Sequence, residues 1–278
     1  MMMMMMMMMM MMIGVVFSQK VRPPPPQQQP EPEHVIHVEI EDTQVQRTIS
    51  EKFVSYTMDA GSNAHYDVFV DTFWENERMR TLARHLSPAR FRFGGTEEDY
   101  TWYGDGDIVL PNKLRLNRTM FLSMLNFSDA ANFDFIFGVN AISQRTETNE
   151  WNYTNFENFL GEIPKDRLVD IHGFELSNEP DLKCVFKTLF YDCNRPPSNV
   201  SEPTNVVSPR QLGHDFKSLE TILEQFYETR PQILGPDVAG HYVTWGKSFL
   251  ENLTTSKPIE FTWHFYYGYV HIHFRDRP

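Results

Sequence analysis

The sequence predicts an α/β fold, and three observations favour a (β/α)8 barrel as its arrangement. Short β-branched and aromatic runs alternate with longer segments of helical periodicity between residues 48 and 278, as in a parallel sheet wound by crossover helices. Polar residues follow each of these runs. A chain of 278 residues with 41% hydrophobic and 14% aromatic side chains suits one large domain.

Six strands are expected, at about residues 53–58, 90–93, 134–139, 173–176, 232–234 and 260–263. Between them, residues 75–86 and 209–228 have the spacing of amphipathic helices. In the second of these segments, apolar side chains recur at positions 212, 216, 219, 222, 223 and 226. These apolar stripes are expected to face the core.

Every expected strand changes character at its carboxyl end, where polar residues follow the apolar run. These residues include Asp59, Thr96, Asn140, Asn178, Glu179, Asp237 and His264. In a barrel, all of these ends lie on the face where the loops build an active site. A doubly wound sheet would also gather its site at the carboxyl ends, so it remains an alternative. No Gly-x-Gly-x-x-Gly follows the first strand, which weakens a dinucleotide-binding interpretation.

The motif Ser177-Asn178-Glu179-Pro180, at the end of the fourth strand, is the sharpest chemical signal. Glycoside hydrolysis needs a carboxylic acid that protonates the leaving oxygen and then, as a carboxylate, activates water. Asn178 can orient the sugar through a hydroxyl near the reacting carbon. Pro180 cannot donate to a strand ladder and therefore ends the strand. The alternative is a strand followed by an ordinary helix N-terminus, where Glu and Pro are common.

Five stretches, in order along the chain, together resemble the heparanase family of glycoside hydrolases. They are residues 80–96 (with the run Phe-Arg-Phe-Gly-Gly-Thr), 135–141, 173–180, 234–238 and 262–267 (Thr-Trp-His-Phe-Tyr-Tyr). The resemblance runs discontinuously from about residue 53 to residue 267. Five ordered matches are far more specific than any one of them, and they make a TIM-barrel glycosidase the expected fold.

The resemblance implies a retaining mechanism on a glucuronic-acid-containing oligosaccharide, with Glu179 as the acid/base and Asn178 orienting the substrate. It also implies sugar contacts from further residues, namely Asp59, Thr96, Asn140 and Tyr266, and His264 is expected to line the cleft. Each has a plainer alternative. Asp59 could be a strand-end cap, Thr96 a turn residue, Tyr266 a rim aromatic and His264 a core histidine.

The same resemblance implies that the barrel is incomplete, with about six of eight strands present. The family supplies its nucleophilic carboxylate from a seventh strand, after the region that matches residues 262–267. We therefore expect residues 48–278 to form a partial (β/α)8 catalytic barrel from a truncated sequence. Glu175 is expected to lie off the cleft floor, because alternation along the strand sets it apart from the tip.

The N-terminal region is expected to lie outside the domain. Residues 1–21 form a signal-like hydrophobic leader, for which a mispredicted start is the alternative, and residues 22–47 form a Pro- and Gln-rich linker and lead-in. Five glycosylation sequons favour the secretory route, at Asn117, Asn126, Asn152, Asn199 and Asn252. A secreted, extracellular-matrix or lysosomal protein is therefore expected.

Only two cysteines occur, Cys184 and Cys193, and they could close a loop disulfide or remain two unpaired thiols. We expect no metal site and no cofactor. Residues 182–203, which contain both cysteines, are read as an insertion that could reshape the edge of the cleft.

The formal net charge of −12 argues against nucleic acid as a partner. The expected partner is a glycosaminoglycan or another polysaccharide that contains glucuronic acid. Any contact with a membrane would run through the leader or through proteoglycans. A sulfated substrate would need a local basic patch, and the candidates are Lys113, Arg115, Arg118, Arg80, Arg84 and Arg90. Scattered surface charge is the alternative.

The leading functional prediction is a retaining endo-β-glucuronidase that acts on heparan-sulfate-like chains. Two alternatives stay open: an exo-β-glucuronidase that acts on simple glucuronides, which the acidic charge mildly favours, and a non-catalytic glycan-binding relative.

Overall fold

A six-stranded parallel sheet organises the part of the chain that the computed structural model describes, residues 48–61, 73–105, 114–182, 207–239 and 243–265. The strands follow one another in sequence order, each hydrogen-bonded to the next. They are β1 (Tyr56–Asp59), β2 (Ala89–Gly94), β5 (Phe133–Val139), β6 (Ile171–Leu176), β7 (Gln232–Val238) and β8 (Glu260–Trp263). All six predicted strands are confirmed, although β7 runs on to Val238.

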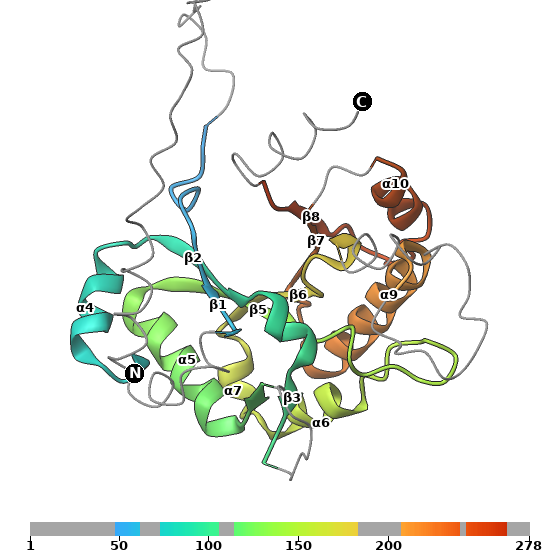
Figure 1. The fold of residues 1–278 in the computed structure, drawn as a ribbon. Coiled ribbons are helices and arrows are strands. Elements are labelled where there is room, and N and C mark those ends of the chain that lie inside the picture. Colours follow the sequence, from blue (N-terminus) through green and yellow to red (C-terminus); the bar gives the residue numbers. More distant parts are fainter. Residues whose placement is uncertain (1–47, 62–72, 106–113, 183–206, 240–242, 266–278) are drawn as a thin grey trace, which may run out of the picture. The chain divides into compact units, whose positions relative to one another are not determined.

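The strand order separates the two candidate architectures. A doubly wound sheet reverses its order at a switch point, whereas the strands of a barrel continue in one direction. Here the order is β1-β2-β5-β6-β7-β8, and the sheet curls so that helices lie along one of its faces (Figure 1). Within the described residues, β1 and β8 each have a single neighbour. The fold is therefore α/β with a curled half-barrel sheet, as an incomplete TIM barrel requires.

The helices begin where the sequence supplies a capping side chain. Asn76 caps α4 (Glu77–Arg84), Asn117 caps α5 (Arg118–Ala131), and Ser208 caps α9 (Pro209–Phe226) with a proline in its first turn. The predicted helices 75–86 and 209–228 correspond to α4 and α9. The other helices are α6 (Thr154–Glu162), α7 (Lys165–Leu168) and α10 (Val243–Glu251).

The segment between β2 and α5 contains short regular elements that the sequence did not predict. It consists of the 3-10 helix η1 (Thr96–Tyr100) and a small parallel pair, β3 (Trp102–Tyr103) and β4 (Arg115–Leu116). Strands of two residues are too short to leave a periodic signal in the sequence.

The face of the sheet that meets the helices is an aromatic core. Phe137 is 1% exposed and its ring lies 4.9 Å from that of Phe121 on α5 and 6.4 Å from that of Phe93 on β2. Phe91 and Phe174, from β2 and β6, pack in the same layer. Aromatic side chains bury the most apolar area per residue, so this layer supplies much of the hydrophobic stabilisation.

The opposite, concave face carries charge. In β2, the outward Phe91 and Phe93 alternate with Arg90 and Arg92, which point into the half-barrel. The sequence left the direction of Arg92 open, and the structure places it inward because the two phenylalanines occupy the helix-facing positions.

Several predictions fall on residues outside the described ranges. These are the leader 1–21, the linker 22–47, Tyr266, Asn199, Lys113 and the cysteines 184 and 193. Among the helices that the structure does describe, none combines the length and the apolar character that a bilayer span needs.

Candidate active site

Glu179 stands on a strained turn at the carboxyl end of β6. Ser177 and Glu179 have positive φ angles of 73° and 49°, which non-glycine residues adopt at a cost of about 1–3 kcal/mol each. Asp99, fully buried on η1, stabilises this turn because its Oδ2 accepts from Ser177 Oγ at 3.1 Å and from the Asn178 amide at 3.0 Å. Its Oδ1 accepts from the Ala141 amide after β5, which ties three strand ends together.

The Glu179 side chain is fixed by a histidine from the other end of the sheet. Its Oε1 lies 2.6 Å from Nδ1 of His264, just after β8, and its backbone amide donates to the Asp237 carbonyl at 3.0 Å. The side chain keeps 13% of its surface exposed. Glu179 is therefore oriented by neighbours from β7 and β8 while part of its carboxyl group stays accessible.

His264 bridges two carboxylates. Its Nε2 lies 2.7 Å from Asp237 Oδ2, opposite the Glu179 contact. Burial alone would lower the pKa of His264, but the hydrogen bonds to Asp237 and Glu179 outweigh it and raise the pKa to about 9. At neutral pH the imidazole is charged and donates from both nitrogens. His264 is therefore not an isolated core histidine, because both of its nitrogens bind carboxylates of neighbouring strands.

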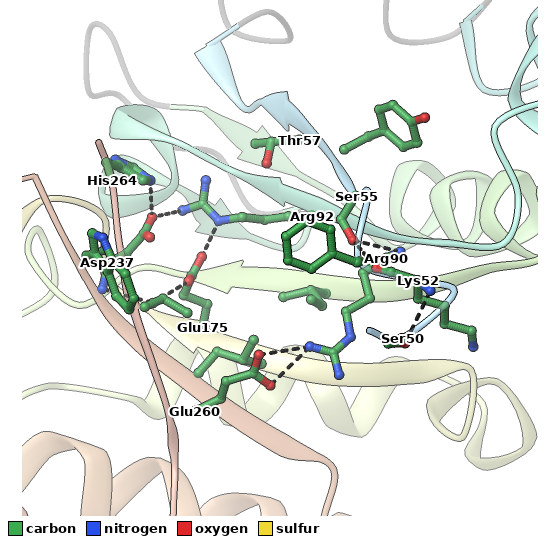
Figure 2. A pocket seen from close by; sticks show the side chains of 16 residues that line it. Ser50, Lys52, Ser55, Thr57, Arg90, Arg92, Glu175, Asp237, Glu260 and His264 are labelled. Atoms are coloured by element: carbon green, nitrogen blue, oxygen red, sulfur yellow. Dashed lines mark hydrogen bonds and ion pairs between the residues drawn. The ribbon is translucent and has the colours of Figure 1, made fainter. Parts of the chain in front are cut away.

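Arg92 joins this group to the floor of the half-barrel (Figure 2). Its Nη2 lies 2.6 Å from Asp237 Oδ2 and 3.0 Å from Asn178 Oδ1, and its Nε donates to Glu175. Burial would lower the pKa of Arg92, but the surrounding carboxylates raise it. Arg92 stays charged and holds acidic groups from β6 and β7 in fixed positions.

Glu98 is the least satisfied member of the group. It is 1% exposed, its Oε2 accepts from the Gly95 amide at 3.0 Å, and its Oε1 has no hydrogen-bond partner. Burial, only partly offset by Arg92, raises the pKa of Glu98 well above that of a free glutamate. A buried carboxyl group in this setting favours the protonated form.

Part of this group of side chains lines a cavity of about 590 Å³ on the concave face (Figure 2). Arg92, Glu175, Asp237 and His264 line it toward the carboxyl ends, and Arg90 pairs with Glu260 at 2.9 Å further down. The expectation that Glu175 lies off the floor was wrong. Glu175 occupies an inward position of β6 and lines the cavity, where Arg92 and Thr262 both donate to it.

The expected sugar-contacting residues differ in how they are placed. Asp59 and Thr96 are exposed at the ends of β1 and β2, and Asp59 Oδ1 accepts from the Gly61 amide at 2.7 Å, as a strand-end cap does. Asn140 is only 1% exposed and its amide binds Thr101 and Ser143. The Asn140 side chain organises the loop after β5, because its Oδ1 accepts from the Ile142 and Ser143 amides and its Nδ2 donates to Thr101 and Ser143.

The asparagines of the predicted glycosylation sequons differ in how exposed they are. Asn126 and Asn152 are exposed, whereas Asn117 and Asn252 are half-buried, with side chains that hydrogen-bond the backbone of α5 and α10.

The predicted basic patch is not one surface. Arg90 pairs with Glu260 across the cavity, while Arg80 and Arg84 lie on α4 and both pair with Glu77.

Sequence reasoning missed Asp99 and Glu98 and gave Asp237 no role. The first two lie in the run Thr-Glu-Glu-Asp-Tyr, which reads as a polar turn, and only the fold shows that it enters the interior. Across the described ranges, no three His, Cys, Asp or Glu side chains are grouped in a way that would hold a metal ion.

Curated proteins with similar sequences fall into two named groups. The chain is 26% identical over 285 residues to a heparanase of Mus musculus, with 84% of the chain and 49% of that protein covered. It is 28% identical over 271 residues to a heparanase of Gallus gallus, covering 79% and 47%. It is 22% identical over 265 residues to a hyaluronoglucuronidase of Hirudo nipponia, covering 84% and 50%.

The chain therefore spans about half the length of the curated relatives it matches. No protein-family model matches the sequence.

Proposed function

We propose that this chain, a heparanase-like protein, carries the general acid/base of a retaining glycosidase that cleaves glycosaminoglycans at glucuronic acid. One observation carries the proposal. Glu179, on the turn after β6, is held at 2.6 Å by His264 from β8 while its side chain remains partly exposed. A catalytic carboxyl group needs this combination of fixed orientation and access to substrate.

In the first step, Glu179 donates its proton to the glycosidic oxygen as the bond to the anomeric carbon breaks. In the second step, the Glu179 carboxylate takes a proton from the water that attacks the same carbon. Asn178 is proposed to assist as a donor to a sugar hydroxyl, since Arg92 binds its Oδ1 at 3.0 Å and leaves the amide nitrogen as its donor.

A retaining reaction needs a second carboxylate roughly 5 Å from the first. Glu175 and Asp237 line the cavity, but both accept strong hydrogen bonds from Arg92, which makes each a poor nucleophile. We therefore assign neither of them this role. The nucleophile is proposed to lie on a seventh strand, beyond the six described here, as the family resemblance implies.

The relatives' names favour a polymeric substrate, since the heparanases and the hyaluronoglucuronidase are named for glycosaminoglycans. We propose endo cleavage of a heparan-sulfate-like chain. The exo-β-glucuronidase alternative has its own support, because the net charge is −12 and three arginines of the predicted basic patch, Arg80, Arg84 and Arg90, pair with glutamates.

The substrate proposal is tested by comparing two substrates at acidic and neutral pH. The protein, in the form its cells produce, is incubated with a defined heparan oligosaccharide and with a chromogenic glucuronide. New reducing ends within the oligosaccharide support endo cleavage, and release of the chromophore alone favours the exo alternative. Cleavage of neither would leave the non-catalytic glycan-binding alternative.

Location is part of the same proposal. A secreted, extracellular-matrix or lysosomal site would bring the protein to its polymer, and the exposed Asn126 and Asn152 are accessible for glycosylation. Mass shifts after glycosidase treatment of the cell-derived protein, lost in Asn126→Gln and Asn152→Gln, are the expected result.

A further inference from the structure

The contact between Glu179 and His264 raises a chemical question. With both groups ionised, Glu179 cannot act as an acid, although the proposed function requires a proton on it at the start of each turnover. That proton lies close by, because His264 Nδ1 is 2.6 Å from Glu179 Oε1. Proton transfer across this hydrogen bond needs no movement of either side chain.

We propose that His264, oriented by Asp237, is the positioning residue that holds the catalytic proton beside Glu179 between turnovers. This rests on Glu179 being the acid/base. When substrate binds, the Nδ1–H bond of His264 breaks and an O–H bond forms on Glu179, which then protonates the leaving oxygen. His264 is left neutral, with its remaining proton on Nε2. After water has attacked, Glu179 returns the proton it gained to Nδ1.

Asp237 determines which nitrogen can release its proton. Its Oδ2 lies 2.7 Å from His264 Nε2 and also accepts from Arg92 at 2.6 Å. A carboxylate in this position keeps the Nε2 proton in place, so only the Nδ1 proton can move. The backbone reinforces the alignment, since the His264 amide donates to the Val238 carbonyl at 2.7 Å and the Glu179 amide to the Asp237 carbonyl at 3.0 Å.

The charges around His264 favour retention of the proton. Among the residues that the structure describes, Glu179 from the turn after β6 and Asp237 from β7 form ion pairs with His264, and Arg92 from β2 stands behind Asp237. Arg92 in turn pairs with Glu175 and Glu98. Four carboxyl groups therefore share two basic groups, and such an excess of acid groups favours protons staying within the cluster.

The direct test is a pH titration of His264. It is monitored by nuclear magnetic resonance of the chain with isotopically labelled histidine. His264→Gln identifies its signal, and the exposed His214 on α9 is the internal reference. We expect His264 to lose its proton near pH 9, well above the ordinary histidine value of about 6.5. Glu179→Gln and Asp237→Asn should each lower the His264 midpoint by about one pH unit or more.

The sign of the accompanying stability change is fixed. Because the pKa of His264 is raised in the folded protein, its stabilising contribution is complete below about pH 6.5 and is lost as the pH rises through about 9. A His264 midpoint at the ordinary histidine value of about 6.5, or one that Glu179→Gln does not move, would overturn the inference.

The second arm is the pH profile of cleavage. His264→Gln removes the group that holds the catalytic proton up to about pH 9, so the proton must then stay on Glu179 alone and the alkaline limb of kcat/KM should move to lower pH while kcat falls. A merely structural role would lower the rate equally at every pH, and that result would also overturn the inference. His214→Gln is the matched control and should leave the profile unchanged.

The two arms separate the two ideas. If wild type cleaves nothing but His264 titrates near pH 9 and responds to Glu179→Gln, the proposed function fails and the proton-holding pair stands. If wild type cleaves but His264 titrates at the ordinary histidine value of about 6.5, the proposed function stands and the proton-holding pair fails.

Discussion

The two faces of the sheet are built on different physical principles. On the helix-facing side, Phe93 and Phe137 stack within an aromatic layer that excludes water. On the concave side, Arg92 links carboxyl groups from three parts of the chain through ion pairs. The two sets alternate along single strands, so one-residue steps in β2 separate hydrophobic packing from charge pairing.

The two faces differ in how their contribution to stability depends on pH. Apolar burial is non-directional and stabilises at any pH, whereas a buried charge cluster is stable only while its charges match. The concave face therefore gives fixed orientation to Glu179 at the cost of pH sensitivity. The following changes test that division.

Phe137→Ala should produce the largest loss on the helix-facing side, about 3–5 kcal/mol in the free energy of unfolding, because it leaves a cavity among aromatic rings. The loss should be the same at pH 5 and pH 7, since no titratable group is involved. Urea denaturation at both pH values measures it. A strongly pH-dependent loss would show that the two faces are not independent.

Arg92→Met should cost a similar amount at pH 7, about 3–5 kcal/mol, because it strands Glu175, Glu98 and Asp237 without their cation. Unlike the loss in Phe137→Ala, this one should shrink as the pH falls, because unpaired buried carboxyl groups take up protons.

The matched control for Arg92→Met is Arg90→Met. Arg90 sits on the same strand, but its pair with Glu260 is more exposed, at 30% and 45%, so about 1 kcal/mol or less is expected. Equal losses for the two variants would mean that burial of the Arg92 cluster contributes nothing.

Asp99→Ala should cost about 2–3 kcal/mol, because it removes the acceptor for Ser177, Asn178 and Ala141. It should also relax the turn that carries Glu179 and lower the rate of cleavage by about 100-fold. The control is Asp129→Ala, since Asp129 makes a surface pair on α5 and should change neither quantity much. Full activity in Asp99→Ala would separate the turn from catalysis.

Much of the fold could be predicted because β-branched and aromatic runs mark the strands of the sheet. All six strands of the sheet and the helices α4 and α9 follow from periodicity and capping residues. The carboxyl-end rule for parallel sheets then brought Glu179 and His264 to the same edge before any contact was known.

The charge cluster could not be predicted, because it depends on which way side chains point after turns. Arg92 meets Asp237 across 145 positions of sequence, and neither residue type signals a partner at that distance. Asn140 follows a strand, as a site residue would. Its side-chain amide nevertheless makes hydrogen bonds to Thr101 and to the loop that begins at Asn140. The prediction for Glu175 was wrong because it counted alternation back from Glu179, whereas the turn at Ser177 and Glu179, with positive φ angles, breaks the alternation of β6.

The most direct test of Glu179 as the acid is its dependence on the leaving group. Glu179→Ala should slow cleavage of a heparan oligosaccharide by about 100- to 10,000-fold, because a sugar alkoxide needs protonation to depart. The first-turnover release of nitrophenol from a nitrophenyl glucuronide should fall much less, because nitrophenolate leaves without a proton. Equal losses on both substrates would contradict the assignment of Glu179.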